Sequence, residues 1–294
     1  MTPKAKNAFE RLIKGVEKVV TSEKWREFLK VQAKFHNYSF NNSLMIFLQM
    51  PTATRVAGFK NWNKLGRKVK KGEKGIKILV PAKYTYFYIE DEEGNEKRVF
   101  LNQATKEQKE LIKAGEIKTY SGMTFKVGHV FDISQTEGKP LPEICKPLDG
   151  EPEEAKRFFE ALSKVITIPV IEEKIQGGAH GYYHIEKDVI ALEVRNALSH
   201  KAKTLVHEYT HSMLDKKDSN IKQKRHEAEI VAESVAFIVA DYFGLDTSSY
   251  SFEYVAAWAG ADPKEILKKG NLIQKTAQKI IEQVEGKMQE DEAA

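Results

Sequence analysis

The chain has 294 residues, 41% of them hydrophobic, which is enough for two ordinary domains with buried cores and excludes a disordered chain. Its single cysteine, Cys145, excludes an intrachain disulfide and favours a reducing, cytoplasmic location. No segment approaches the ~18–20 apolar residues of a membrane span, and the N-terminus lacks the apolar core of a signal peptide, so we expect no membrane partner.

Positive charge is concentrated in the first half of the chain. Residues 1–150 contain 28 Lys and Arg against 17 Asp and Glu, a net charge of +11, whereas residues 151–294 have a net charge of −6. A basic half joined to an acidic half indicates two separate roles, with a polyanion as the partner of the basic half.

The basic half predicts a mixed domain of helices and strands. Apolar spacing indicates two helices within residues 5–35 and a short helix before Pro51, which Asn41 or Asn42 could cap. A further short helix over Phe59–Leu65 precedes a glycine-rich basic turn, KKGEKG at residues 70–75. Strands are expected at Ile76–Pro81, Tyr84–Ile89, Val99–Leu101 and Val127–Ile133, with a partly helical stretch over Asn102–Phe125.

The stretch over residues 134–152 is rich in proline and glycine and is the expected linker. The predicted fold class is therefore α+β with two domains, a basic one at residues 1–133 and a second at residues 153–294. In the second domain we expect a helix at Glu153–Ile166, followed by a strand and a strand pair within residues 168–196. Three further helices are expected at Lys201–Asp215, Lys224–Phe243 and about Asn271–Gln289.

The segment KTLVHEYTHSMLD has the spacing of a zinc-peptidase helix. His207 and His211 are four residues apart, so a helix places both imidazoles on one face, where they can bind one metal ion. Glu208 projects beside that ion, where it can take a proton from the attacking water and pass it to a leaving amine. An alternating strand upstream, Gly181–Leu192, suits an extended peptide substrate. The alternative is a surface helix that happens to carry two histidines.

A catalytic metal site needs a third protein ligand and an open position. Glu229 and Glu233 are again four residues apart, on an otherwise apolar helix where charges are rare unless paired or ligated. We assign Glu229 as the third ligand and Glu233 as the carboxylate that orients a histidine ring, although the opposite assignment is open. Zinc is the expected ion, and manganese or cobalt would also suit the site.

The upstream strand carries other candidates for the same chemistry. One of His180, His184, Tyr182 and Tyr183 could donate a hydrogen bond to the transition state, and the sequence does not choose among them. The alternative for the acidic and histidine residues together is an ion-paired helix bundle without a metal.

From Arg55 to Lys77 there are nine Lys and Arg residues and one acidic residue, Glu73, with aromatic residues in between. This combination is typical of proteins that bind single-stranded nucleic acid, because cations follow the phosphates and flat rings stack on bases. The candidate contacts are Tyr38, Asn41, Asn42, Trp62, Lys64, Arg67, Lys68, Lys70, Lys71 and Lys74. The alternative is a solvated lysine face with its aromatic residues in the core.

These segments resemble the ArdC antirestriction family. The stretch from NNSLMIFLQMP to WNKLGRKVKKGEKGIKILVP resembles its N-terminal single-stranded-DNA-binding domain. The pieces LVHEYTH, AEIVAESVAF and SFEYVAAWAGADPKEILKKG resemble its zincin-like, gluzincin-type metallopeptidase domain. The turn is richer in lysine than is usual for the family, which favours phosphate tracking over base reading.

The resemblance implies metal binding by His207, His211 and Glu229, with Glu208 as the catalytic glutamate. It also implies sequence-independent binding of single-stranded DNA, carriage on a mobile element and protection of incoming DNA from host restriction. A protein substrate, either a restriction subunit or a regulator, is expected if the site is a peptidase.

Two other functions fit the same residues. One is a regulatory metalloprotease similar to the ImmA/IrrE group, which cleaves a repressor. The other is a DNA-binding protein whose metal site is purely structural.

Overall fold

The computed structural model describes residues 2–16, 19, 21–90, 95–140, 152–214, 225–247 and 262–293. Most of the predicted linker, Cys145 and the Trp-containing tail segment lie outside these residues. By contacts the chain forms two compact units. We call Met1–Arg11 with Lys77–His129 the strand unit, and Leu12–Ile76 with Val130–Ala294 the helical unit.

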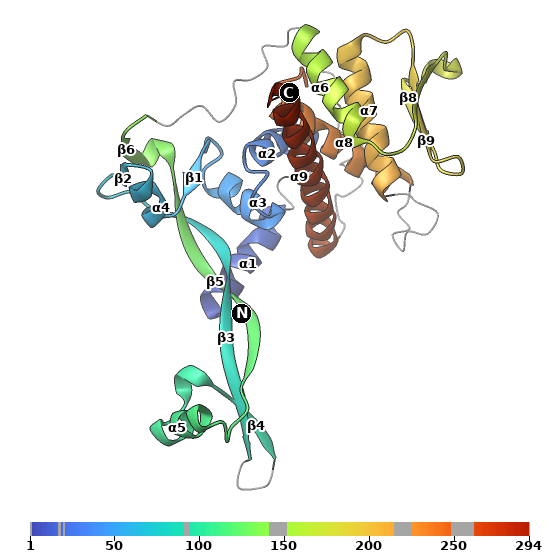
Figure 1. The fold of residues 1–294 in the computed structure, drawn as a ribbon. Coiled ribbons are helices and arrows are strands. Elements are labelled where there is room, and N and C mark those ends of the chain that lie inside the picture. Colours follow the sequence, from blue (N-terminus) through green and yellow to red (C-terminus); the bar gives the residue numbers. More distant parts are fainter. Residues whose placement is uncertain are drawn as a thin grey trace. The chain divides into compact units, whose positions relative to one another are not determined.

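Long antiparallel strands dominate the strand unit (Figure 1). Its main elements are β3 (Ile76–Glu90), β4 (Glu96–Phe100), η1 (Leu101–Gln103), α5 (Lys106–Ala114) and β5 (Tyr120–Asp132), and α1 (Pro3–Val16) begins in it. The two strands expected before residue 90 are one continuous strand. Pro81 does not end it, because a φ near −65° is compatible with extended backbone and proline forfeits only one ladder hydrogen bond.

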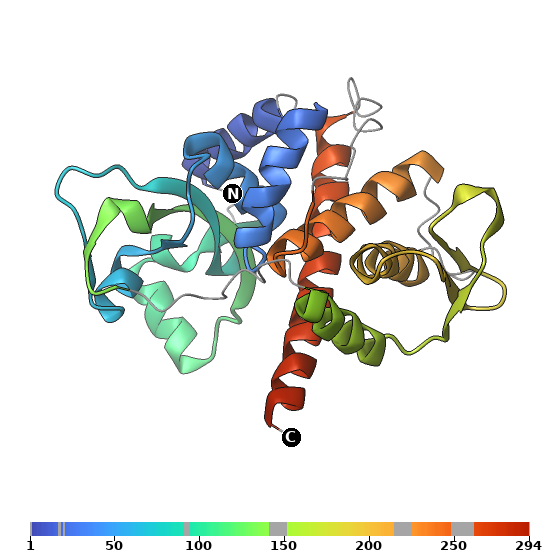
Figure 2. The same cartoon turned by 90° about the horizontal axis from the view of Figure 1, so that it is seen from above.

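Helices build the core of the helical unit, as Figure 2 shows from above. They are α2 (Ser22–Lys34), α3 (Phe40–Gln49), α6 (Pro152–Val165), α7 (Leu198–Leu214), α8 (Arg225–Tyr242) and α9 (Pro263–Ala293). Trp25, Phe28 and Phe40 are fully buried and pack with ring centroids 5.1–6.2 Å apart. The Trp25 indole donates a hydrogen bond to Ser234 Oγ on α8 at 3.0 Å.

This packing divides the chain differently from the boundary predicted near residues 134–152. Helices α2 and α3 come from the basic half, yet they pack against α8 and α9 of the acidic half. At one of these contacts Gly270 of α9 leaves room for the Phe40 ring, because a Cβ there would lie 2.3 Å from Phe40 Cζ. A local pattern shows that a helix has an apolar face but not which helix covers it, so the partners were not predictable.

The N-cap of helix α3 lies two to three residues earlier than expected. Ser39 is the N-cap residue, and its hydroxyl accepts the backbone N–H of Asn42 at 3.4 Å. The predicted caps, Asn41 and Asn42, therefore lie within the first turn of the helix.

Short helices and strands surround the basic turn. They are α4 (Phe59–Lys64), β2 (Arg67–Val69), η2 (Ile133–Gln135) and β6 (Thr136–Gly138), with β1 (Val56–Ala57) pairing with the end of β5. Strands β2 and β6 form an antiparallel pair in which Arg67 lies opposite Gly138. Gly66 joins α4 to β2 with a φ of +74°, in the left-handed region that favours glycine.

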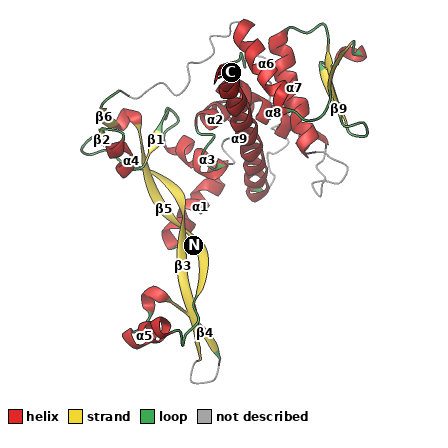
Figure 3. Ribbon diagram, viewed as in Figure 1, coloured by secondary structure: helices red, strands yellow, loops and turns green. Residues whose placement is uncertain are grey.

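The remaining sheet lies beside α7 (Figure 3). Its strands are β7 (Val170–Glu173), β8 (Gly181–His184) and β9 (Val189–Glu193), in the order β7-β9-β8, and η3 (Gln176–Gly178) precedes β8. Strand β8 is antiparallel to β9 and forms an edge of this sheet. None of the helices within the described ranges combines the length and the apolar character needed to cross a membrane.

Candidate functional site

Three side chains from two helices converge at the centre of the site. His207 Nε2 lies 3.2 Å from His211 Nε2 and 3.3 Å from Glu229 Oε2, and His211 Nε2 lies 3.7 Å from the same carboxylate oxygen. Two atoms that bind zinc at ~2.0–2.1 Å with tetrahedral geometry are separated by about 3.4 Å. The triangle of ligand atoms therefore has the size of one face of a tetrahedral metal site, and these residues fit a divalent cation.

The helical repeat explains why the triangle forms. His207 and His211 are one turn apart on α7, and Leu205 and Val206 bury the other side of that helix. Helix α8 packs along α7 and brings Glu229 opposite the two imidazoles. The sequence alone predicts that His207 and His211 share one face of α7, whereas the position of α8 depends on tertiary packing.

Glu233 contacts the other side of the same ring. Its Oε2 lies 3.1 Å from His207 Nδ1. A carboxylate at this distance accepts the Nδ1 proton, which leaves the Nε2 lone pair directed at the triangle. Glu229 and Glu233 therefore contact different nitrogens of His207, Glu229 on the ligand side and Glu233 on the orienting side.

The two carboxylates make the centre attractive to positive charge. Burial by itself would lower the pKa of His207, but hydrogen bonds with Glu229 and Glu233 raise it to about 10. Hydrogen bonds with His207 and His211 lower the pKa of Glu229 well below its usual value. Without a metal the centre holds a proton instead, so a bound cation and a proton compete for the same place.

Glu208 lies beside the triangle and faces a cavity of about 460 Å3. Its side chain is buried, and burial raises the pKa of its carboxyl group above the usual value. The backbone N–H of Tyr183 donates a hydrogen bond to this carboxylate. Gly181 on β8 lets the strand approach α7 closely, because a Cβ there would lie 2.6 Å from Thr204 Cγ2.

The cavity is lined by His180, Gly181, His200, Lys203 and Thr204, together with His207, Glu208 and Glu233. Of these residues, His200, Lys203 and Thr204 were not among the candidates expected from the sequence. His200, Lys203 and Thr204 lie seven, four and three residues before His207, so helical spacing could have placed them on the same face.

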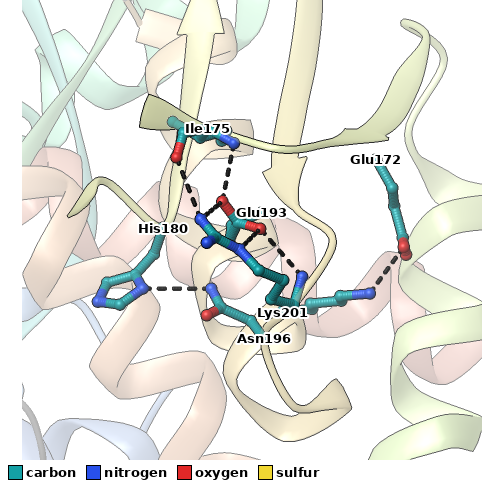
Figure 4. Close-up of polar contacts among 7 residues, drawn as sticks. Glu172, Ile175, His180, Glu193, Asn196 and Lys201 are labelled. Carbon is teal, nitrogen blue, oxygen red and sulfur yellow. Dashed lines mark hydrogen bonds and ion pairs between the residues drawn. The ribbon is translucent and has the colours of Figure 1, made fainter. Parts of the chain in front are cut away.

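An ion pair between the buried Glu193 and the exposed Arg195 holds the strand end that carries His180 (Figure 4). Glu193 is 4% exposed, and its carboxylate accepts the backbone N–H of Ile175 at 2.8 Å and two guanidinium N–H groups of Arg195 at 2.7 and 2.8 Å. Its own backbone N–H donates to His180 O at 2.9 Å. Hydrogen bonds from Arg195 are the main cause that lowers the pKa of Glu193 to about 2.

Asn196 then sets the orientation of the His180 ring. Its Nδ2 donates to His180 Nδ1 at 3.2 Å, which leaves the proton of the neutral ring on Nε2 (Figure 4). The rings of His180 and His200 lie 4.1 Å apart between their centroids. Of the four transition-state donors considered on this strand, His180 is the one that lines the cavity.

In the basic segment, the predicted role of Trp62 is wrong. Its side chain is 1% exposed, and its indole donates to Phe131 O at 2.8 Å. A ring so deeply buried has no face on which a base can stack. Trp62 is a core residue that fastens α4 to β5.

Several other predicted contacts also have structural partners. Arg67 donates to Thr136 Oγ1 at 2.8 Å and to three backbone carbonyls of residues 136–139. Lys70 donates to Ser134 O at 2.9 Å, and the Tyr38 hydroxyl donates to Val56 O at 3.3 Å. Asn41 accepts a hydrogen bond from Asn271 on α9 at 3.3 Å. Arg67 and Lys70 therefore fix the backbone beside the basic turn, whereas Tyr38 and Asn41 make contacts within the helical unit.

The remaining lysines of the turn are on the surface. Lys64, Lys68, Lys71 and Lys74 are exposed, so their ammonium groups are accessible to a polyanion. The half-buried Asn42 contributes its backbone N–H to the start of α3.

Comparisons with known proteins agree with this architecture. Residues 4–131 match the family model for the N-terminal domain of the anti-restriction factor ArdC. The fold is similar to two crystal structures of the antirestriction protein ArdC from plasmid R388. The metal-free structure has a TM-score of 0.53 and 20% sequence identity, and the match covers 86% of each chain. The Mn(II)-bound structure has a TM-score of 0.52 and 19% sequence identity, and the match covers 96% of this chain and 97% of that one.

The chain combines a segment of the ArdC N-terminal type with a helix pair that carries a histidine and glutamate cluster. Residues 4–131 belong to the family of ArdC N-terminal domains, and the chain as a whole is ArdC-like in fold. A relative from Bacillus anthracis, the uncharacterized protein pXO2-81, is 29% identical over 98% of this chain. The chain spans about half of that relative's length, 54%.

Proposed function

We propose that this protein binds single-stranded DNA without sequence preference and carries a metal-dependent, peptidase-type hydrolytic site. The observation that carries the hydrolytic part is the triangle of His207, His211 and Glu229 with Glu208 beside it. The Mn(II)-bound structure of the similar R388 protein supports a divalent-cation site in this chain. Zinc is the ion we propose, because two imidazoles and one carboxylate suit its tetrahedral preference.

In this proposal each residue has a separate task. When bound, the cation would supply Lewis-acid polarisation of a peptide carbonyl. Glu208 takes the proton of the attacking water and transfers it to the leaving amine, and its raised pKa makes it a better base than an exposed glutamate. Glu233 keeps His207 in the ligating tautomer, and His180 presents its Nε2 proton toward the cavity as a hydrogen-bond donor.

The cavity favours an enzyme over a purely structural metal site. Structural zinc sites are closed by four protein ligands, whereas catalytic sites keep an open position beside a space for substrate. Here three ligand atoms are grouped among the described residues, and about 460 Å3 of space lies next to them. Edge strand β8 begins at this space with Gly181 and can pair with an extended peptide, which would be a restriction subunit or a regulator.

The exposed lysines support the DNA-binding part. Lys64, Lys68, Lys71 and Lys74 are accessible on a segment with nine cationic residues and one acidic residue. Binding through phosphates is sequence-independent and weakens as salt rises. Together with the family, this favours a protein of a mobile element that protects incoming single-stranded DNA from host restriction inside the cytoplasm.

Two measurements test the proposal. Metal analysis of the purified protein should find one divalent ion per chain, which His207→Ala abolishes and Glu208→Gln retains. Transfer of a mobile element into a restricting recipient should then be compared for wild type and Glu208→Gln. Loss of protection with the metal still bound supports catalysis. Full protection by Glu208→Gln would instead identify a structural metal site, and cleavage of a repressor would identify a regulatory protease.

A further inference from the structure

We infer that the hollow between α4 and β2 is a pocket for one base of a single-stranded nucleic acid, with the Phe59 ring as its stacking platform. The inference rests on the proposed single-stranded-DNA binding and adds a specific site to it. The hollow has a volume of about 430 Å3, within the range of small-molecule sites. It is lined by Phe59, Asn63, Gly66, Arg67, Lys68 and Val69.

Phe59 is an aromatic residue that the fold leaves half in water. Its side chain is 53% exposed, whereas Trp62 on the same short helix is 1% exposed. The ring is held by an edge contact with Phe131, with centroids 6.4 Å apart and planes at 70°. A flat apolar ring beside an open hollow is the arrangement on which a nucleobase stacks.

The walls of the hollow are fixed before any ligand binds. Trp62 ties α4 to Phe131 O, and the Arg67 guanidinium is tied to the backbone of β6. Gly66 makes the sharp turn between α4 and β2 at a φ of +74°. A preformed pocket loses little conformational freedom when it is filled, so a single stacked base adds measurably to affinity.

The charge around the hollow matches a nucleic acid. Lys68 lines it, and Lys60 and Lys64 are exposed on the same helix as Phe59. Phosphates on either side of a stacked base can reach these ammonium groups. Asn63 is exposed at the wall, and its amide can donate to or accept from any base edge, so the pocket discriminates little between sequences. A base within a duplex is already stacked on both faces, which restricts the ligand to single strands.

The test compares Phe59→Ala with two controls in the full-length protein. Phe59→Trp keeps a stacking ring, and Phe125→Ala removes a ring of similar exposure, 45%, from the strand unit. Affinities are measured by fluorescence anisotropy for oligo(dT) at several salt concentrations and, by competition, for heparin, a polyanion without bases. Thermal unfolding of each variant verifies that it is folded.

We expect Phe59→Ala to weaken oligo(dT) binding by about fivefold to a hundredfold, the range for loss of one stacked base. The salt dependence and the heparin affinity should stay at the wild-type level, because no cation is removed. Phe59→Trp should retain oligo(dT) binding. Equal oligo(dT) affinity of Phe59→Ala and wild type, or an equal loss in Phe125→Ala, would overturn the inference. Failure of the wild type itself to bind oligo(dT) would instead remove the proposed DNA-binding function.

Discussion

The metal centre and the basic segment both stand out in the sequence, but the fold uses their residues differently. On α7 and α8 the ligand atoms of His207, His211 and Glu229 meet within 3.2–3.7 Å. On α4 and β2 the two residues that define the pattern best, Trp62 and Arg67, are bonded to the backbone of residues 131–139.

The difference teaches how to separate ligand-binding residues from residues that build the site. The half-buried polar groups of the candidate metal centre face one another around a shared point that could hold a cation. Buried polar groups in the basic segment each have a backbone partner, which needs nothing further. In the second region the exposed side chains, namely the surface lysines and Phe59, are the ones we propose to contact nucleic acid.

The largest expected effect distinguishes the two carboxylates of the metal centre. Glu229→Gln removes a ligand, so we expect metal affinity to fall by more than about a hundredfold. Glu233→Gln removes an orienting group, and a loss of about ten- to a hundredfold is expected. Glu227→Gln is the matched control, since Glu227 on the same helix pairs with Lys269. Titration against a chromophoric chelator measures all three, and a larger loss in Glu233→Gln would reverse the two roles.

A second prediction concerns pH. In the metal-free protein the pKa of His207 is raised to about 10, so the stability that its proton provides is fully present below the unfolded value of ~6.5. That contribution should be lost as pH rises from ~6.5 through 10. Metal affinity should change in the opposite direction and strengthen with pH over the same window, because the cation displaces the proton. Unfolding midpoints measured with EDTA and with added zinc give both trends. Parallel pH trends in the two series would contradict competition at His207.

Trp62→Phe tests whether the most prominent aromatic residue of the basic segment belongs to the core. It removes the hydrogen bond to Phe131 O and leaves space behind, so we expect unfolding to become easier by roughly 1–3 kcal/mol. Urea denaturation measures this loss. The affinity of the folded variant for oligo(dT) should not change. A loss of affinity without any loss of stability would show that Trp62 contacts the nucleic acid.

The smallest effects separate neighbouring cations. Arg67→Lys cannot reproduce the forked contacts with β6, so a stability loss of about 1–2 kcal/mol is expected. Lys68→Gln should leave stability unchanged and reduce the salt slope of oligo(dT) binding by about 0.7, the value for one phosphate contact on a single strand. Chemical denaturation and anisotropy titrations distinguish them. The reverse pattern would show that Arg67 and not Lys68 contacts the phosphates.

Much of the fold was predictable from local patterns. Helices α6, α7 and α8 begin and end within a few residues of the ranges expected from apolar spacing, and the pair Ile76–Pro81 and Tyr84–Ile89 merges into β3 without a change of type. The packing of α2 and α3 against α8 and α9 was not predictable, because it joins apolar faces more than 200 residues apart, as in the contact between Trp25 and Ser234.

The sequence by itself determined that His207, Glu208 and His211 lie within one turn of a helix and that the Arg55–Lys77 segment is basic, because helical geometry and charge depend only on residues close in the chain. Only the tertiary structure decided that Glu229 meets the two histidines while Glu233 contacts the far side of a ring. It also decided that Trp62 and Arg67 are occupied by partners about 70 residues away while Phe59 remains exposed. Burial and partnership are properties of surfaces brought together by folding, and no local spacing encodes which surfaces meet.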